Sequence, residues 1–465
     1  MTGIFGIVGI GLSLVLLMYL AYRGVNVLIL APVLALVAVL FDRSAPVFGT
    51  YTQIFMVGMG KFTVKYFPIF LLGAIFGKLM EDSGSARVIA RKIVERAGKE
   101  RAILAIVLSC ALLTYGGVSV FVVAFAVYPL AAALFRAADV PKRLIPGSIA
   151  LGSFTFTMTC LPGTVQIHNL IPMPYFKTTA FAAPVLGTLG GLLMFAGGML
   201  WLDRRARAGA RAGEGYGSGH SHEAPATLPA KLPSFPAAVL PIVAVIVLNY
   251  VFSEHIIPRW DAAYLAEPKF GSTDLGELRG IWSILAALVL SIGLVAALSF
   301  RSLLRLNDSL SQGAAGSLVP IFNTASVVGY GATIASLAAF VVVKDSVLGL
   351  APGNPLISEA VAINVLAGIT GSASGGMSIA LEALGDTYYA LGTQAGLDPG
   401  LMHRIAAMAS GGLDTLPHNG AVITLLAICG LTHRQSYKDI AVVSLVVPLV
   451  ATAIILTLGT LFGSF

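Results

Sequence analysis

The chain has 465 residues, of which 57% are hydrophobic and 11% are charged, and its formal net charge is +7. A soluble domain carries about 25% charged residues, so this composition excludes an ordinary soluble enzyme or binding module. The basic residues lie in short segments between apolar runs, as in the cytoplasmic loops of membrane proteins, and do not indicate nucleic-acid binding.

The apolar runs predict an all-α polytopic membrane protein with ten full crossings, because ~20 apolar helical residues span a bilayer. The expected crossings run approximately over residues 3–21, 25–41, 63–80, 143–171, 180–202, 236–253, 281–300, 317–341, 401–431 and 440–463. Two further apolar stretches, 102–135 and 357–391, are too long for one crossing and too short for two with a loop. Each has a glycine–serine break at its middle, so each is predicted to be a re-entrant hairpin that enters and leaves on the same side.

The charged loops test this count of crossings. With ten crossings and two hairpins, the basic loops all fall on one face, which the positive-inside rule makes cytoplasmic. They contain Arg87, Arg91, Lys92, Arg96, Lys99, Arg101, Arg136, Lys142, Arg143, Arg204, Arg205, Arg207, Arg211, Arg301, Arg305, His433, Arg434 and Lys438. The opposite face receives residues 254–280, where acidic residues outnumber basic ones.

The same count predicts two inverted-topology repeats. Residues 1–203 and residues 236–465 each give three crossings, a hairpin and two further crossings, with opposite orientation. Between them, residues 204–235 are rich in Ala, Gly, Arg, Ser, His and Pro and are expected to form a cytoplasmic linker without regular structure. Helix breaks at matching places in two such halves are typical of the substrate site of a secondary transporter.

The sequence predicts no metal site and no cofactor. The linker segment 219–222, Gly-His-Ser-His, is interpreted as a solvated polar loop. Three cysteines lie inside apolar spans without metal-ligand spacing and are interpreted as small buried hydrophobes. They are Cys110, Cys160 and Cys429.

The hairpin tips are the first candidate binding elements. A helix that ends inside a membrane leaves backbone groups without partners, and its N-terminus offers a partial positive charge that suits a carboxylate. The first tip supplies Gly116, Gly117 and Ser119, and the second supplies Ser372, Ser374, Gly375 and Gly376. Small-residue helix packing is the alternative interpretation of both clusters.

The two expected spans 143–171 and 401–431 contain proline–glycine breaks with polar neighbours. Proline and glycine open the hydrogen-bond ladder of a helix, which exposes carbonyl groups to a ligand. In the first span, Thr157 and Thr159 precede the break, and Thr164, Gln166, His168 and Asn169 follow it. In the second, Thr415 and Asn419 flank Pro417. Thr157, Thr159, Thr164, Thr415 and Asn419 are predicted to bind substrate.

Asp414 lies in the second break, and a carboxylate inside a span is costly enough to be a functional candidate by default. His418 follows four residues later, and a histidine titrates near physiological pH. The two residues are predicted to carry a coupling proton. The alternative is a buried Asp–His pair that only holds the broken span in shape.

Four segments carry a resemblance to a known family. They are Gly-Lys-Leu-Met-Glu-Asp-Ser-Gly at 77–84, Gly-Ile-Thr-Gly-Ser-Ala-Ser-Gly-Gly at 368–376, His-Arg-Ile-Ala at 403–406 and Asp-Thr-Leu-Pro-His-Asn-Gly at 414–420. Over essentially its whole chain, and most strongly in the second half, the sequence resembles the gluconate permease (GntP) family. The resemblance implies proton symport of gluconate or related hydroxy- or keto-acids, inverted repeats with re-entrant hairpins, a homodimer and an elevator-like motion.

The expected partners are therefore a small organic anion, protons and the lipid bilayer of a bacterial inner membrane. Sodium-coupled relatives in the wider superfamily carry Ser-Asn-Thr at each hairpin tip, and this chain does not, which favours protons as the coupling ion. Sodium-coupled carboxylate symport and ion or proton antiport share the architecture and remain the main alternatives. A channel fits two opposed hairpins less well. An intramembrane enzyme is disfavoured because the breaks carry neither an HExxH nor a GxSxG motif.

Overall fold

A computed structural model describes residues 2–23, 25–42, 45–217, 232–298, 306–351 and 353–463. Within these ranges the chain is helical and has no strand. The segment 219–222 of the expected linker and the basic residues Arg301 and Arg305 lie outside the described residues. An all-helical chain satisfies its backbone hydrogen bonds internally, as a bilayer requires.

The helices of the first half run in the following order. They are α1 (Thr2–Tyr22), α2 (Val27–Phe41), α3 (Val47–Thr50), η1 (Tyr51–Phe55), α4 (Met56–Asp82), α5 (Ser85–Ala97), η2 (Lys99–Arg101), α6 (Ala102–Tyr115), α7 (Val120–Ala137), α8 (Leu144–Ser153), α9 (Phe156–Thr159), α10 (Ile167–Leu170), α11 (Met173–Phe176) and α12 (Pro184–Arg211). Helix α12 extends past Asp203 to Arg211, so the start of the expected linker is helical.

The second half contains the remaining elements. They are α13 (Phe235–Val251), η3 (Phe252–Ile256), η4 (Ile257–Arg259), η5 (Ala263–Ala266), η6 (Pro268–Phe270), α14 (Leu275–Leu298), α15 (Leu306–Ser336), α16 (Phe340–Leu348), α17 (Pro355–Thr370), α18 (Ala373–Gln394), α19 (Pro399–Ser410), η7 (Leu413–Thr415), α20 (Gly420–Cys429), α21 (His433–Ala441), η8 (Val442–Val446) and α22 (Val447–Phe462). The segments η1, η3 and η8 are single π-helical turns.

Seven helical segments in the described ranges are long and apolar enough to cross a membrane. They are Val47–Asp82, Val120–Ala137, Pro184–Arg211, Phe235–Arg259, Leu275–Leu298, Leu306–Ser336 and His433–Phe462. This confirms an all-α polytopic membrane protein. Several other expected crossings are apolar but shorter or broken, and α7, expected as a hairpin arm, is long enough to cross by itself. The ten crossings, the re-entry of the hairpins and the inverted repeat stay predictions.

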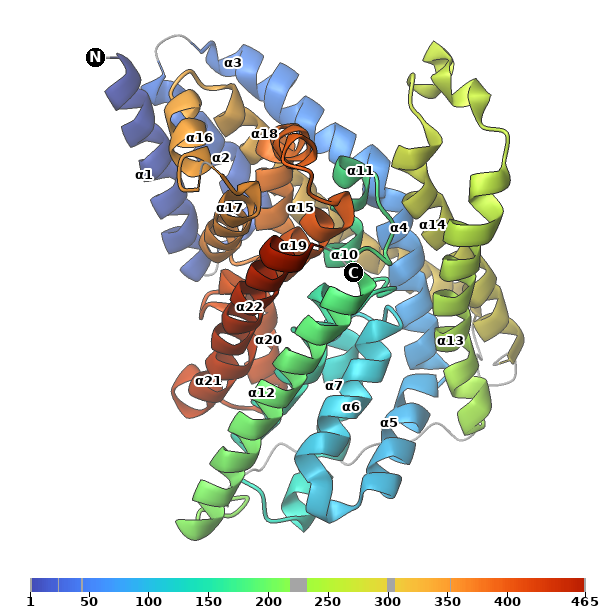
Figure 1. Cartoon of the computed structure of the whole chain (residues 1–465). Helices are drawn as coiled ribbons and strands as arrows, with labels where there is room; N and C mark the ends of the chain where they lie inside the picture. Colours follow the sequence, from blue (N-terminus) through green and yellow to red (C-terminus); the bar gives the residue numbers. More distant parts are fainter. Residues whose placement is uncertain are drawn as a thin grey trace.

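The two predicted hairpins are pairs of packed helices at opposite ends of the molecule. The pair α6–α7 lies in the lower part of Figure 1 and the pair α17–α18 in the upper part. Helix α17 ends at Gly371, whose left-handed backbone (φ 61°) reverses the chain, and the hydroxyl of Ser372 caps α18 by accepting from the Gly375 N–H (3.1 Å). Local sequence therefore explains the turn of the second hairpin.

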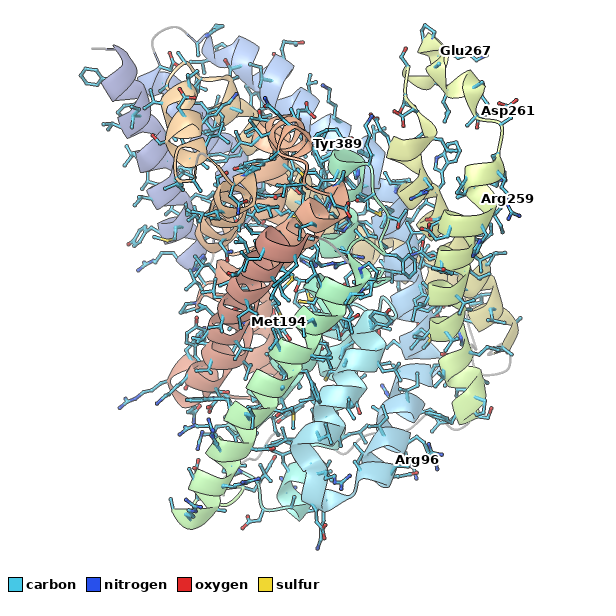
Figure 2. The ribbon with its side chains drawn as sticks, in the orientation of Figure 1. Arg96, Met194, Arg259, Asp261, Glu267 and Tyr389 are labelled. Atoms are coloured by element: carbon cyan, nitrogen blue, oxygen red, sulfur yellow. The ribbon has the colours of Figure 1, made fainter. Side chains whose placement is uncertain are left out.

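Helices α12 and α22 pack together, and α12 also contacts α6 of the first hairpin, while α4 packs along α15 and α14 (Figure 1). Ile379 of α18 belongs to a second apolar cluster with residues of α1, α2 and α15, so the second hairpin also contacts these helices. Arg96 lies at one end of the molecule, and Arg259, Asp261 and Glu267 lie toward the other (Figure 2).

Candidate functional site

The first helix break lies between α8 and α10. Threonine hydroxyls occupy the backbone carbonyls that the interrupted helix leaves without N–H partners: Thr155 donates to Leu151 O (2.6 Å) and Thr157 to Gly152 O (2.7 Å). Thr159 donates to Thr155 O (3.2 Å). Since each hydroxyl proton is already in use, Thr157 and Thr159 could meet a substrate only through their lone pairs, by accepting from its hydroxyl groups.

The first hairpin tip is attached to this break. Gln166 donates from Nε2 to Thr114 O (2.7 Å), at the C-terminal end of α6, and the Tyr115 hydroxyl donates to Pro162 O (2.6 Å). Thr164 is fully buried, and the N–H of Gln166 lies 3.5 Å from its hydroxyl oxygen. The sequence predicted no role for Gln166. Its amide side chain beside the predicted break is the feature that indicates this contact with Thr114.

The predicted tip residues of the first hairpin lie in different surroundings. A Cβ on Gly116 would clash with Ile242 of α13, and one on Gly117 would clash with Val165, so both glycines permit close packing. Ser119 is half-buried at the N-terminus of α7, where its side chain makes no capping hydrogen bond. Ser119 is therefore the one residue of the three that could offer a side-chain hydroxyl to a ligand.

The second break lies between α19 and α20 and is held by Asn419. Its Oδ1 caps α20 by accepting from Val422 N (2.9 Å), and its Nδ2 donates to Asp414 O (2.9 Å) and Gly371 O (3.0 Å). The last bond joins the break to the second hairpin tip, as Gln166 joins the first. The side chain of Asn419 is fully used in these contacts, so the structure gives it a positioning role.

Thr415 is bound to the segment that precedes α22. Its hydroxyl donates to Ser444 O (3.0 Å), the Ser444 hydroxyl donates back to Thr415 Oγ1 (3.0 Å), and Tyr437 donates to Thr415 O (3.1 Å). This contact fixes the turn η7 against η8. Direct contact between Thr415 and a substrate stays a prediction.

The second hairpin tip divides into capping and packing residues. Ser372 caps α18 and lies 3.5 Å from the Ser374 hydroxyl, and both side chains are half-buried. Gly375 is buried, and its N–H is the donor to Ser372. A Cβ on Gly376 would overlap the backbone of Ala367, so Gly376 is required for the close approach of α17 and α18.

Asp414 and His418 are both buried, with exposed fractions of 6% and 8%. Within the described residues, Asp414 Oδ1 and His418 Nε2 have no hydrogen-bond partner, so these two atoms do not bond to each other. The His418 ring instead lies against Gly371 at the hairpin tip. A buried polar atom without a partner costs about 1–3 kcal/mol, which is unfavourable for a purely structural pair and is typical of a site that awaits a ligand or proton.

Arg404 joins the two breaks. It is fully buried in α19 and donates to Ala182 O (2.8 and 3.2 Å), to Thr159 O (3.2 Å) and to Asn169 Oδ1 (2.9 Å). Among the described residues it forms no ion pair with an acid. A fully buried positive charge therefore lies beside Thr159 with only neutral oxygens as partners. The sequence could have indicated Arg404 as a functional candidate, because Arg404 lies inside an apolar span as Asp414 does.

Asn169 is the counterpart of Asn419 in the first break. Its Nδ2 donates to Thr164 O (3.0 Å) and Ala180 O (2.9 Å), and its Oδ1 also lies 3.2 Å from His403 Nε2. In both breaks a His–Asn pair follows, and the asparagine amide donates to the carbonyl five residues earlier. By this spacing Thr164 corresponds to Asp414, and His168 corresponds to His418.

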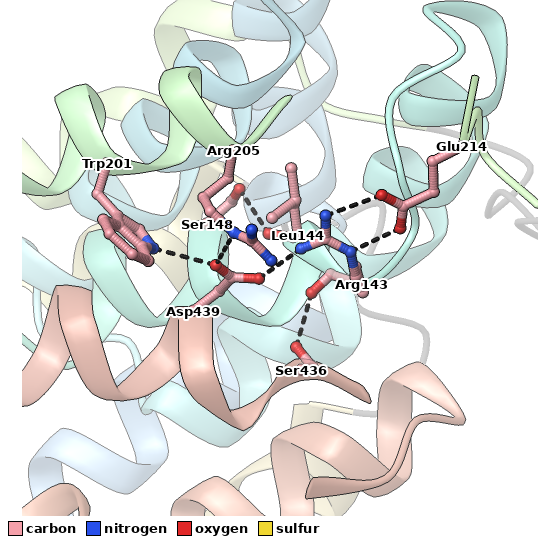
Figure 3. Close-up of polar contacts among 8 residues, drawn as sticks. All are labelled: Arg143, Leu144, Ser148, Trp201, Arg205, Glu214, Ser436 and Asp439. Atoms are coloured by element: carbon pink, nitrogen blue, oxygen red, sulfur yellow. Dashed lines mark hydrogen bonds and ion pairs between the residues drawn. The ribbon is translucent and has the colours of Figure 1, made fainter. Parts of the chain in front are cut away.

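An ion-pair cluster joins α8 and α12 of the first half to α21 of the second half (Figure 3). Asp439 of α21, 1% exposed, accepts from Arg143 (2.8 Å), Arg205 (2.9 Å) and Trp201 (3.0 Å). Arg143 also binds both carboxylate oxygens of Glu214 (2.6 and 2.9 Å), and this hydrogen bonding holds the pKa of Glu214 below its usual range. The cluster fixes the start of α8 against α12 and α21.

No group of three His, Cys, Asp or Glu side chains in the described part of the chain could hold a metal ion. The three cysteines are buried and unpaired with one another. The chemistry available at the breaks within the described residues therefore includes hydroxyls, amides, backbone carbonyls, the carboxyl group of Asp414, the imidazoles of His168, His403 and His418, and the guanidinium of Arg404.

Long apolar helices with two interrupted spans and a buried polar site define a multi-pass membrane transporter. The model of the GntP family permeases matches residues 3–264, and the chain belongs to this family. It is 46% identical over 449 residues to the uncharacterized transporter YxjC of Bacillus subtilis, covering 94% of this chain and 95% of that protein.

Two more distant similarities were found. A transporter of Haemophilus influenzae is 30% identical over 138 residues, which is 30% of this chain and 32% of that protein. The crystal structure of the Alcanivorax borkumensis YdaH transporter, described as having an unusual topology, superposes with a TM-score of 0.54 at 16% identity over 88% of both chains. That likeness supports the fold alone.

Proposed function

We propose that this permease carries a small organic anion, gluconate or a related sugar acid or hydroxy acid, together with protons. The observation that carries the proposal is that one broken span contains two buried ionisable groups. Asp414 has an unpartnered oxygen, and Arg404 has no acid partner among the described residues. A site for an anion needs a positive potential, and coupling to protons needs a group that changes charge.

The charge on Asp414 gives a simple coupling scheme. An ionised Asp414 repels an anionic substrate, and a protonated Asp414 does not. Two negative charges about 6 Å apart at an effective dielectric constant of about 20 repel by about 3 kcal/mol, which is about a hundredfold in affinity. By linkage, substrate then binds better to the protonated site, and a proton binds better to the loaded site.

The remaining contacts define where the substrate would bind. Its carboxylate would lie near the hairpin tips, held by backbone N–H groups and the hydroxyls of Ser119, Ser372 and Ser374. Its hydroxyl groups would donate to Thr157 and Thr159, whose own protons bond to backbone carbonyls. His418, against the second tip, would share the proton with Asp414. Asn169 and Asn419 would hold the breaks in shape.

The wider setting belongs to the same proposal. The protein would lie in a bacterial inner membrane with residues 204–235 on the cytoplasmic side. The two halves would form inverted repeats, and two copies would form a homodimer in which the hairpins and breaks move as an elevator against α4 and α13–α15. Accessibility of single cysteines introduced at Arg96 and Glu267, at opposite ends of the molecule, tests the orientation.

The deciding experiment is uptake of labelled gluconate into proteoliposomes with the inside alkaline, with and without sodium. Uptake that needs the pH gradient and ignores sodium supports proton symport. No gluconate uptake, with short hydroxy- or keto-acids competing instead, moves the substrate but keeps the mechanism. A requirement for sodium, or exchange driven from the opposite side, supports the sodium-coupled or antiport alternative.

The role of Asp414 has its own variant. Asp414→Asn keeps the shape of the side chain but cannot change charge, so pH-gradient-driven uptake should fall by about a hundredfold while substrate exchange at equal pH persists. The matched control is Asp386→Asn, because Asp386 is exposed on α18. Full proton-driven uptake by the Asp414→Asn variant would remove the coupling role.

A further inference from the structure

After Asp414, Glu359 is a second buried carboxyl group with an unpartnered oxygen in the described residues, and it lies outside the breaks. It lies in the second turn of α17, in the second hairpin, and only 1% of it is exposed. Its Oε1 has no hydrogen-bond partner within the described residues. An ionised carboxylate in this position costs several kcal/mol, so a purely structural role would be served better by glutamine or an apolar residue.

The elements packed on α17 offer Glu359 no counter-charge. These elements are α1, α16, α18, α19, η7 and α22. The described part of α1 carries no charged residue, and neither does α22. Lys344 and Asp345 lie on α16, and within the described residues no ion pair joins Lys344 to Glu359. Asp414 of η7 lies near the other end of α17, close to the hairpin tip.

The charged groups of α18 and α19 are engaged elsewhere. Glu382 is exposed and accepts from Tyr175 (3.0 Å), and Asp386 is exposed. His403 and Arg404 of α19 bond to Asn169 in the first break. Tyr388 of α18 remains, and it is the titratable side chain that lies beside Glu359.

A surface cavity reaches Ser358, the neighbour of Glu359 in the chain. It has a volume of about 220 Å³ and lies between the end of α16, the start of α17 and the end of α18. Its outer rim includes the exposed residues Leu391 and Gln394, and its wall includes the buried Ser358, next to Glu359 in the chain. The Tyr388 ring is fully buried beside Ser358, and its hydroxyl has no hydrogen-bond partner in the described ranges.

We propose that Glu359 is a proton-binding site within the second hairpin, supplied from the surface through this cavity by way of Ser358 and Tyr388. A hydronium ion in the cavity gives its proton to the Tyr388 oxygen and becomes water. The Tyr388 hydroxyl releases its own proton to Glu359 through a bridging water, because the two side chains do not bond to each other directly. The carboxylate becomes a neutral carboxylic acid, and Tyr388 is regenerated unchanged. Release runs through the same groups in reverse.

The position gives this site a use in transport. The second hairpin carries the candidate tip residues at one end and Glu359 near the other, so protonation removes a buried charge from the hairpin arm. A neutral arm crosses or rotates in a low-dielectric environment at lower cost than a charged one. The proposal rests on the proposed proton coupling for its physiological role, but the protonation of Glu359 can be measured without transport.

Infrared difference spectroscopy on the purified, reconstituted protein provides that measurement. A protonated carboxyl group in an apolar site gives a C=O stretching band that shifts in D₂O and is separate from ionised carboxylates. We expect one such band to disappear in Glu359→Gln and a second to disappear in Asp414→Asn. Glu382→Gln is the matched control, because Glu382 is an exposed carboxylate of the same hairpin, and its substitution should leave the band intact.

Transport provides the second measurement. Glu359→Gln should lower the number of protons carried per substrate, and Tyr388→Phe should slow pH-gradient-driven uptake about tenfold while the Glu359 band persists. Glu359→Asp, which keeps an acid, covers the case in which Glu359→Gln elutes as an aggregate. An unchanged band and an unchanged pH profile in Glu359→Gln would overturn the proposal. Uptake by the unsubstituted protein that ignores the pH gradient would overturn the proposed coupling, and the infrared band would still decide whether Glu359 binds a proton.

Discussion

The two helix breaks use one backbone device for two different purposes. In each, an asparagine amide donates to the carbonyl five residues earlier, but the first has Thr164 where the second has Asp414. Asn169 is fastened further by Arg404, whereas Asp414 Oδ1 stays without a partner among the described residues. The first break is thus held by a buried positive charge, and the second contains a buried carboxyl group with an unpartnered oxygen.

The largest expected effect on stability comes from removing the hydrogen bonds that Arg404 donates to the first break. Arg404→Gln leaves buried carbonyls of Thr159 and Ala182 without their donors, and should lower the free energy of unfolding by about 1–3 kcal/mol for each carbonyl. Thermal unfolding in detergent measures this. Arg404→Lys is the control, because it keeps the charge but not the planar fork, and should recover only part of the loss. A variant without Arg404 that is as stable as the unsubstituted protein would contradict the contrast between the breaks.

The second prediction concerns a substitution that places at position 414 the residue type found at Thr164 in the first break. Asp414→Thr removes a buried acid with an unpartnered oxygen, so stability should stay within about 1 kcal/mol of the starting value or rise. Proton-driven uptake should fall by about a hundredfold. Thr164→Val is the matched change in the first break and should leave proton coupling intact. Equal loss of coupling in both variants would mean that the breaks are not chemically distinct.

How far the sequence could predict this site depends on the kind of residue. Breaks and hairpins were predictable because Pro162, Gly163, Gly371 and their neighbours act locally on the backbone. Asp414 was predictable because a charge in an apolar span is costly. Arg404 obeys the same rule, but its bonds to Thr159 and Ala182 depend on packing of segments more than two hundred residues apart.

Side-chain roles were harder to predict than backbone breaks. In the structure the hydroxyls of Thr157 and Thr415 donate to backbone carbonyls, and their contact with a substrate stays a prediction. Gly376 faces Ala367, and its contact with a ligand also stays a prediction. The sequence identifies a polar group near a break, but only the folded structure shows whether that group already forms a hydrogen bond within the protein.

The third prediction concerns the ion-pair cluster that both halves share. Asp439→Asn leaves Arg143 and Arg205 with a neutral partner in a buried position, and should cost about 1–3 kcal/mol of stability. Because the cluster joins α8, α12 and α21 rather than either break alone, the pH dependence of uptake should not change. Urea or thermal unfolding measures the first effect and proteoliposome uptake the second. A shifted pH profile would show that the cluster acts on one break selectively.

The smallest expected effect is at Glu214, on the exposed side of the same cluster. The hydrogen bonds from Arg143 lower the pKa of Glu214 below its value in the unfolded chain. A lowered pKa contributes stability above the unfolded value, about 4.3, and the contribution is lost as pH falls through the folded value. Because the side chain of Glu214 is 38% exposed, solvent screening keeps the contribution below about 1 kcal/mol.

Comparing Glu214→Gln with the unsubstituted protein tests this sign. The variant should unfold at a slightly lower temperature near neutral pH, and the difference should vanish as the medium is acidified below about pH 4. Added salt should shrink the difference near neutral pH, since the pair is partly exposed. A difference that grows on acidification would mean that Glu214 is stabilised in its protonated form, and that Asp439 rather than Glu214 is the main partner of Arg143.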